Sequence, residues 1–191
     1  MRDFGSIQSP QHAFILNLGL ESLHVRMPQH CKNGQAAAEF LQAHPKIRFV
    51  RYPGLAGDPY HELAQKHMPN GTCGVVSFGF EGGRAAAEQF MKSLKLAQIA
   101  THVADARTCV LHPANATHRQ MNDEELVACG ISPDMVRLSC GIESTEGFAG
   151  RPGAGAGNSV DEALMRQLSG AADNASVAPL FAICKWGSIA A

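Results

Sequence analysis

The stretch "MVRLSCGIES", Met135 to Ser144, is an apolar segment that ends near a glycine and carries one arginine. Its aliphatic and β-branched residues predict a strand. A guanidinium is costly to remove from water unless it pairs with an anion, so Arg137 is a candidate binding residue. The residues alone leave two interpretations open. Arg137 either lies on a sheet edge or pairs with a carboxylate such as Glu143 or Asp105, or its planar fork holds the carboxylate of a ligand.

The composition limits the class of protein around this segment. A chain of 191 residues with 45% hydrophobic and 17% charged content is expected to form one globular domain, with room for a tail. Sixteen basic and seventeen acidic side chains, with no basic run, argue against nucleic acid or an anionic membrane surface as partner. No segment approaches the roughly 20 apolar residues of a membrane span, and the first ten residues lack the apolar core of a signal peptide. The sequence therefore predicts a cytoplasmic protein.

Cysteine and histidine patterns do not predict a metal site. The six cysteines form no CxxC pair, and the nine histidines form no HExxH or HxH motif. His112 and His118 in "HPANATH" are too far apart for one helical face. In a reducing compartment such scattered cysteines are expected to be small core residues.

Helix and strand signals alternate along the first three quarters of the chain. Ser9 as N-cap and Pro10 at the first helical position begin a long helix, or two helices broken near Pro28. Asp58 and Pro59 give the same signal for the helix in "DPYHELAQKHM", and Asn122 with Glu125 forms a capping-box pattern. Further helix signals cover 83–97, and strand signals cover 46–52, 72–80, 107–112 and 135–143.

This alternation predicts an α/β domain over residues 1–147, with a largely antiparallel or mixed sheet, helices on one face and a long helix before it. Residues 148–191 are rich in glycine and alanine, and they are expected to form a poorly ordered tail with one short helix in "SVDEALMRQL". The segment "GFEGG" lacks a phosphate-loop pattern, so a strand-to-helix turn is expected there. No GxSxG motif is present, and adjacent Glu124 and Glu125 fit the first turn of a helix.

Several ordered segments, among them "SPQHAFILNLGLESLHVRM", "PYHELAQKHMP", "FGFEGG" and "HPANATHRQMNDEELVACGISPDMVRLSCGIE", resemble the carboxy-terminal part of the Cys/Met-metabolism pyridoxal-phosphate enzymes. Within that family the chain most resembles the O-acetylhomoserine sulfhydrylases, also called O-acetylhomoserine aminocarboxypropyltransferases. The similarity runs in order from Arg2 to about Glu143.

This resemblance implies the small domain of a fold-type I transferase that uses pyridoxal phosphate as an electron sink. The implied reaction is γ-replacement on O-acetylhomoserine by sulfide or a thiol, in transsulfuration and methionine biosynthesis. In the family the arginine of the "RLSxGIE" motif binds the substrate α-carboxylate, which places that role on Arg137. The family's "NVGDA" segment also lines the pocket and reads "HVADA" here, so His102 and Ala104 replace the family's asparagine and glycine.

The resemblance also shows what this sequence does not match. The family's Schiff-base lysine, its aspartate partner for the cofactor ring and its phosphate-binding residues belong to a large domain that has no counterpart here. None of the chain's own lysines has the context of that lysine: Lys32, Lys46, Lys66, Lys92, Lys95 and Lys185. Without such a lysine the covalent chemistry has no starting point, so the chain is expected to be inactive alone. It would need a complementing large domain, or it would self-associate through the apolar face that the divergent tail leaves uncovered. The alternative is a non-catalytic carboxylate-binding or interaction module.

Overall fold

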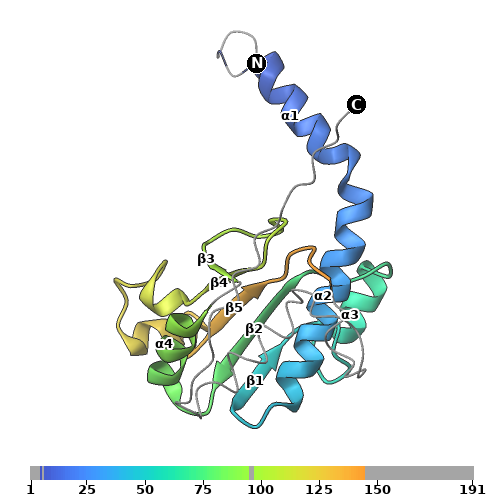
Figure 1. Ribbon diagram of the computed structural model, residues 1–191. Coiled ribbons are helices and arrows are strands. Elements are labelled where there is room, and N and C mark those ends of the chain that lie inside the picture. Colours follow the sequence, from blue (N-terminus) through green and yellow to red (C-terminus); the bar gives the residue numbers. More distant parts are fainter. Residues whose placement is uncertain (1–4, 6, 95–96, 145–191) are drawn as a thin grey trace, which may run out of the picture.

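A computed structural model describes residues 5, 7–94 and 97–144. The order of elements is α1 (Pro10–Glu21), α2 (Leu23–Ala43), β1 (Ile47–Arg51), α3 (His61–His67), β2 (Val75–Phe80), α4 (Gly83–Ser93), β3 (Gln98–Ile99), β4 (Cys109–Leu111), the 3-10 helix η2 (Pro113–Asn115), α5 (Asp123–Ala128) and β5 (Val136–Ser139). Figure 1 shows α2 lying against the sheet while α1 extends away from it. The expected tail, 148–191, lies outside the described residues.

The five strands form one mixed sheet in the order β1-β2-β5-β4-β3. Only the short pair β3 and β4 is parallel, and the other neighbours are antiparallel. The predicted α/β fold with a mixed sheet is therefore confirmed. The strand built from the "MVRLSCGIES" segment, β5, lies in the middle of the sheet and not at its edge.

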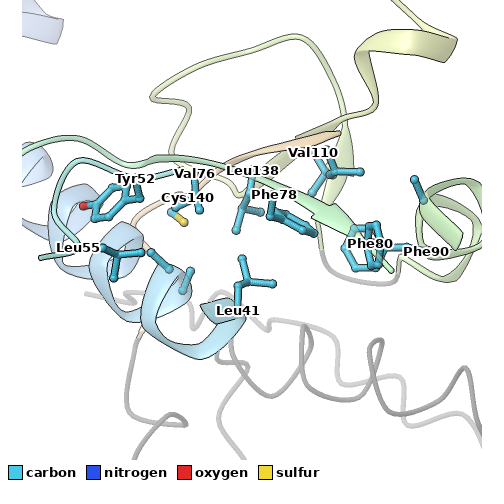
Figure 2. Packing of buried hydrophobic residues seen from close by; sticks show 14 residues of the cluster. Leu41, Tyr52, Leu55, Val76, Phe78, Phe80, Phe90, Val110, Leu138 and Cys140 are labelled. Atoms are coloured by element: carbon cyan, nitrogen blue, oxygen red, sulfur yellow. The ribbon is translucent and has the colours of Figure 1, made fainter. Parts of the chain in front are cut away.

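One face of the sheet packs against α2 and α4 to form the core (Figure 2). Alternate residues of β2 and β5 point to this face, as the two-residue period of a strand requires. The helices fill the other side of the core with small residues and a few large ones. The buried side chains include Val76, Phe78 and Phe80 from β2, Val136 and Leu138 from β5, Ala37, Ala38 and Leu41 from α2, and Ala87 and Phe90 from α4.

Two of the predicted helix starts are confirmed by hydrogen bonds. The Ser9 hydroxyl accepts a bond from the backbone N–H of His12 at 3.2 Å, with Pro10 at the first helical position. Asn122 and Glu125 form the expected reciprocal capping box at the start of α5. Local side chains thus satisfy N–H groups that the helices leave unpaired.

Two other predictions about helices were wrong. The long amino-terminal helix is divided at Ser22, and Pro28 lies inside α2. The third helix begins at His61, because the Asp58 carboxylate is used to close the turn after β1: it accepts bonds from the backbone N–H groups of Tyr52 and Tyr60 at 3.0 and 2.9 Å.

Cysteine burial agrees only in part with the sequence-based prediction. Cys109 and Cys140 are buried, Cys31 and Cys73 are half-buried, and Cys129 is exposed. The described part of the chain contains no cluster of three or more histidine, cysteine, aspartate or glutamate side chains arranged for a metal ion. None of its helices is long and apolar enough to cross a membrane.

Candidate functional site

Arg137 lies on the sheet face opposite the core, between two neighbouring strands. Its partners in the sheet register are Ser77 of β2 and Leu111 of β4. Val136 and Leu138 on either side of it are fully buried in the core. The alternation of β5 therefore directs the half-buried arginine to the outer face, at the centre of the sheet.

The guanidinium of Arg137 is only partly satisfied by the protein. Nη2 donates to the backbone oxygens of Thr101 at 2.8 Å and His102 at 3.4 Å. The Nε atom is buried and has no hydrogen-bond acceptor, and no acceptor among the described residues meets Nη1. Since arginine carries five N–H donors in a fixed fork, the donors on Nε and Nη1 remain for a ligand.

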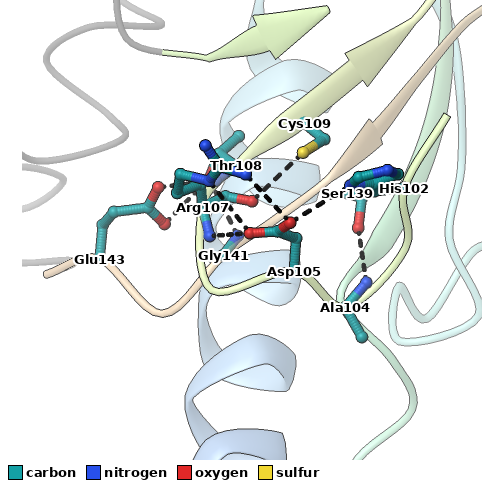
Figure 3. A network of polar contacts seen from close by, with 9 residues as sticks. All are labelled: His102, Ala104, Asp105, Arg107, Thr108, Cys109, Ser139, Gly141 and Glu143. Atoms are coloured by element: carbon teal, nitrogen blue, oxygen red, sulfur yellow. Dashed lines mark hydrogen bonds and ion pairs between the residues drawn. The ribbon is translucent and has the colours of Figure 1, made fainter. Parts of the chain in front are cut away.

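The two carboxylates that were considered as partners of Arg137 bind elsewhere (Figure 3). Asp105 accepts bonds from the Arg107 side chain and backbone and lies 3.3 Å from Nδ1 of His102. Hydrogen bonds from Arg107, and then from His102, hold the pKa of Asp105 well below its ordinary value. Asp105 is therefore ionised and bonded within its own loop. The interpretation of Asp105 as the ion-pair partner of Arg137 is wrong.

Glu143 is hydrogen-bonded to Thr108, the residue before β4. Its carboxylate accepts from the Thr108 backbone N–H at 2.7 Å and from the Thr108 hydroxyl at 3.0 Å. The same hydroxyl accepts from the backbone N–H of Gly141 at 2.9 Å. A Cβ on Gly141 would lie 2.5 Å from the backbone oxygen of Ala106, so the glycine of the "SCGIE" segment allows the loop before β4 to approach the end of β5.

A second contact holds this loop over Arg137. The backbone N–H of Ala104 donates to the Ser139 hydroxyl at 3.1 Å. Ser139 follows Arg137 by two residues and therefore shares its face of β5. Ala104 has a φ of 58°, a left-handed conformation that costs a residue with a Cβ about 1–2 kcal/mol. Ser139 thus helps to fix the loop whose carbonyl oxygens bind the guanidinium.

The predicted site residue His102 reaches Arg137 through its backbone and not through its ring. Its carbonyl oxygen lies 3.4 Å from Nη2 of Arg137, while its largely exposed ring pairs with Asp105. Thr101 and Ser139 were missed by the sequence interpretation. The two-residue period of β5 is a signal that would have placed Ser139 beside Arg137, whereas a backbone carbonyl such as that of Thr101 leaves no signal in the sequence.

The described residues do not form a pyridoxal-phosphate site of their own. The cofactor needs a lysine amine beside the substrate, but the four lysines of the described part, Lys32, Lys46, Lys66 and Lys92, are all exposed and lie on or beside α2, β1, α3 and α4. The "GFEGG" segment forms the expected turn from β2 into α4. A Cβ on Gly79 would lie 2.3 Å from the Phe49 ring, so side chains fill the space beside that glycine. No step through the cofactor is therefore assigned to this chain's residues.

The geometry defines an α/β domain with an incompletely bonded guanidinium on the face of its sheet opposite the core. Residues 1–149 match the family model described as Cys/Met metabolism PLP-dependent enzyme. The chain belongs to this family, whose cofactor is pyridoxal phosphate.

The relatives carry names from sulfur amino-acid metabolism. The chain is 42% identical to a homocysteine synthase of Schizosaccharomyces pombe over 75% of this chain and 33% of that protein. It is 40% identical to O-acetyl-L-homoserine sulfhydrylase 1 of Thermus thermophilus over 76% of this chain and 35% of that protein. An L-methionine gamma-lyase of Fusobacterium nucleatum is also 40% identical, over 74% of this chain and 36% of its own length. The chain spans about a third of the length of these relatives.

A solved structure confirms the fold class. A Campylobacter jejuni protein named as an O-acetylhomoserine (thiol)-lyase superposes with a TM-score of 0.74 and 32% identity, covering 88% of this chain and 37% of the other. Its crystal structure contains N'-pyridoxyl-lysine-5'-monophosphate. The described domain therefore has the fold of part of a fold-type I enzyme, as the sequence predicted.

Proposed function

We propose that this chain is the substrate-carboxylate-binding part of an O-acetylhomoserine sulfhydrylase-type enzyme. In this proposal Arg137 binds the α-carboxylate of the amino-acid substrate, and the loop that contains His102 forms the adjoining wall. The reaction is γ-replacement, in which acetate leaves O-acetylhomoserine and sulfide or a thiol takes its place. The names of the relatives support the substrate class.

The observation that carries the proposal is that the Nε and Nη1 donors of Arg137 have no acceptor among the described residues. Nε is buried without an acceptor, and Asp105 and Glu143 are bound to Arg107 and Thr108. Leaving a buried donor unsatisfied costs about 1–3 kcal/mol. A carboxylate oxygen that accepts from Nε removes this cost through a charge-assisted bond.

The exposed positions of the described lysines support a separation of carboxylate binding from catalysis. Binding of a carboxylate needs only Arg137 and its loop, whereas catalysis needs a lysine that the described residues do not bring to the site. We therefore expect the 191-residue chain alone to bind carboxylate weakly and to catalyse no γ-replacement. The same observation favours the second candidate, a carboxylate-binding module that works without a cofactor.

NMR of the full chain tests the role of Arg137 at the atom concerned. The Nε–H signal of Arg137, identified by its loss in Arg137→Lys, is followed during titration with O-acetyl-L-homoserine. The expected result is a saturable shift that the methyl ester of the same amino acid does not produce, because the ester lacks the carboxylate. Arg84→Lys is the matched control, since Arg84 already bonds to Asn115 and Asp123. Equal shifts with acid and ester, or no shift, would contradict the proposal.

Chemical trapping tests the expected inactivity. The chain is mixed with pyridoxal phosphate and reduced with borohydride in the presence of free lysine, and pyridoxyl-lysine is located by peptide mapping. We expect no label, or scattered label that free lysine suppresses. One stoichiometric lysine that free lysine does not compete with would show that the chain supplies its own cofactor-binding residue. Both the separation of carboxylate binding from catalysis and the cofactor-free module would then be wrong.

A further inference from the structure

The helix α2 carries a polar cluster that the proposed function does not use. Gln29, His30 and Asn33 lie on one side of α2, and His30 and Asn33 are each only 1% exposed. Polar side chains buried to this extent are normally hydrogen-bonded within the protein. Each of the three donates to a backbone oxygen of the segment 140–143, which directly follows β5.

Asn33 holds two peptide carbonyls of this segment at once. Its Nδ2 donates to the backbone oxygen of Gly141 at 2.9 Å and to that of Glu143 at 2.8 Å. Its Oδ1 accepts from Nε2 of Gln29 at 2.9 Å, and the same Nε2 donates to the Glu143 oxygen at 3.1 Å. Both N–H donors of the Asn33 amide are therefore used. Because the two carbonyls lie two residues apart, this amide fixes the course of the backbone between them.

His30 extends the same attachment by one residue. Its Nδ1 lies 2.7 Å from the backbone oxygen of Cys140. Since a carbonyl oxygen only accepts hydrogen bonds, Nδ1 carries the proton in this contact. The helix α2 thus binds the carbonyls of residues 140, 141 and 143.

The other side of the segment 141–143 binds the end of the loop between β3 and β4. The Gly141 N–H donates to the Thr108 hydroxyl at 2.9 Å, and the Glu143 carboxylate accepts from the Thr108 N–H at 2.7 Å (Figure 3). Between them, the Ile142 N–H donates to the backbone oxygen of Ala106 at 3.0 Å. Asn33 therefore lies on one side of this segment and the loop on the other.

The same loop holds the guanidinium of the candidate site. The carbonyl oxygens of Thr101 and His102 accept from Nη2 of Arg137 at 2.8 and 3.4 Å. A loop fixed at residues 106–108 restricts where these two carbonyls can lie. A continuous series of hydrogen bonds and loop backbone thus connects Asn33 to Arg137.

Packing of α2 on the sheet does not require an amide at this position. The helix is already held there by the buried apolar residues Ala37, Ala38 and Leu41. An amide is costly to bury unless its hydrogen bonds are made, whereas an apolar side chain of similar size has no such requirement. The bonds of Asn33 go instead to the chain that leaves the Arg137 strand.

We propose that Asn33 is a positioning residue for Arg137. It holds the segment 141–143, this segment holds the loop between β3 and β4, and the loop orients the guanidinium. The inference rests on the proposed function, because it explains how the free donors of Arg137 are kept in place for a substrate carboxylate. Binding groups of this kind depend on a supporting set of hydrogen bonds around them.

NMR of the full chain tests this role with Asn33→Leu, which has a side chain of similar size and no donors. The Nε–H signal of Arg137, identified by its loss in Arg137→Lys, is expected to shift or broaden in the ligand-free variant. The affinity for O-acetyl-L-homoserine should fall about tenfold, because a displaced donor loses most of one hydrogen bond. Gln29→Met removes a single bond to the Glu143 oxygen. It should produce smaller changes of the same kind, and it serves as the test if Asn33→Leu does not fold.

The helix offers a control that separates positioning from loss of stability. Leu41 lies two turns after Asn33 and is fully buried in the core. Leu41→Val should lower the thermal unfolding midpoint through core packing. It leaves the bonds to the segment 140–143 in place, so the Arg137 Nε–H signal and the affinity should match those of the unaltered chain.

The possible outcomes are distinct. If Asn33→Leu lowers the unfolding midpoint but keeps both the Nε–H signal and the affinity, the inference is overturned and Asn33 has only a structural role. Equal changes of the signal in Leu41→Val would overturn it as well. If the unaltered chain shows no carboxylate-dependent shift, the proposed function fails. The ligand-free Nε–H signal of Asn33→Leu still decides the inference in that case: a changed signal supports it, and an unchanged signal overturns it.

Discussion

Replacement of Thr108 by valine tests the bonding that fixes the loop over Arg137. The Thr108 hydroxyl accepts from the Gly141 N–H at 2.9 Å and donates to the Glu143 carboxylate at 3.0 Å, and Thr108 is 2% exposed. Valine keeps the shape of the side chain and removes both bonds. The buried Gly141 N–H then lacks an acceptor, at a cost of about 1–3 kcal/mol. Glu143 is half-buried, so water replaces part of its lost bond.

The expected net effect of Thr108→Val is a loss of about 2 kcal/mol in the free energy of unfolding, after a gain below about 1 kcal/mol from the added methyl group. This equals roughly a 30-fold change in the unfolding equilibrium constant. Urea unfolding of the full chain, followed by circular dichroism, measures it. Thr108→Ser keeps the hydroxyl and should cost less than Thr108→Val. Equal midpoints for Thr108→Val and the unaltered chain, or a larger loss in Thr108→Ser, would refute the reasoning.

Three further substitutions extend the test. Ala104→Gly should raise the free energy of unfolding by about 0.5–1 kcal/mol, because relief of the left-handed strain exceeds the entropy cost of glycine; an unchanged urea midpoint would contradict the strain. Gly141→Ala should lower it by about 2 kcal/mol or more, because the new Cβ would meet the Ala106 oxygen at 2.5 Å; wild-type stability would show that the loop yields freely. Burial raises the pKa of Tyr52 from 10.0 to about 12, so its stabilising contribution is complete below pH 10 and is lost as the pH rises through 12. Tyr52→Phe should remove that part of the alkaline fall in stability, and parallel pH profiles of the two proteins would exclude it.

Local signals predicted the fold where the chain satisfies its own backbone. Ser9 and Asn122 cap helices through bonds that span three residues, so the pattern in the sequence is also the contact in the structure. Pro28 and Asp58 were misinterpreted because the deciding contacts lie elsewhere. The bend at Ser22 is held by Arg26, and Asp58 is drawn to the backbone of Tyr52 at the end of a strand.

The candidate site could be predicted only in part because its bonds are distant in sequence. The chemistry of a guanidinium in an apolar strand singled out Arg137, and the resemblance to a family gave that residue a role. Thr101 lies 36 residues from Arg137, and Thr108 lies 35 residues from Glu143. Their pairing depends on β4 and β5 being neighbours in the sheet, which the order of the strands in the sequence does not determine.

Arg137 shows how a local cost can indicate function. A buried leucine or methionine on the central strand would leave no donor unsatisfied, and apolar replacements of buried charges are often neutral or stabilising. This strand instead carries an arginine, whose Nη2 donates to two backbone carbonyls. The carboxylates of Asp105 and Glu143 are hydrogen-bonded to Arg107 and Thr108. Neutralising the guanidinium with Asp105 or Glu143 would satisfy folding but would block an incoming anion. The structure thus leaves guanidinium donors of Arg137 without a protein partner, as an incoming carboxylate would need, and local departures from optimal stability of this kind are expected at functional sites.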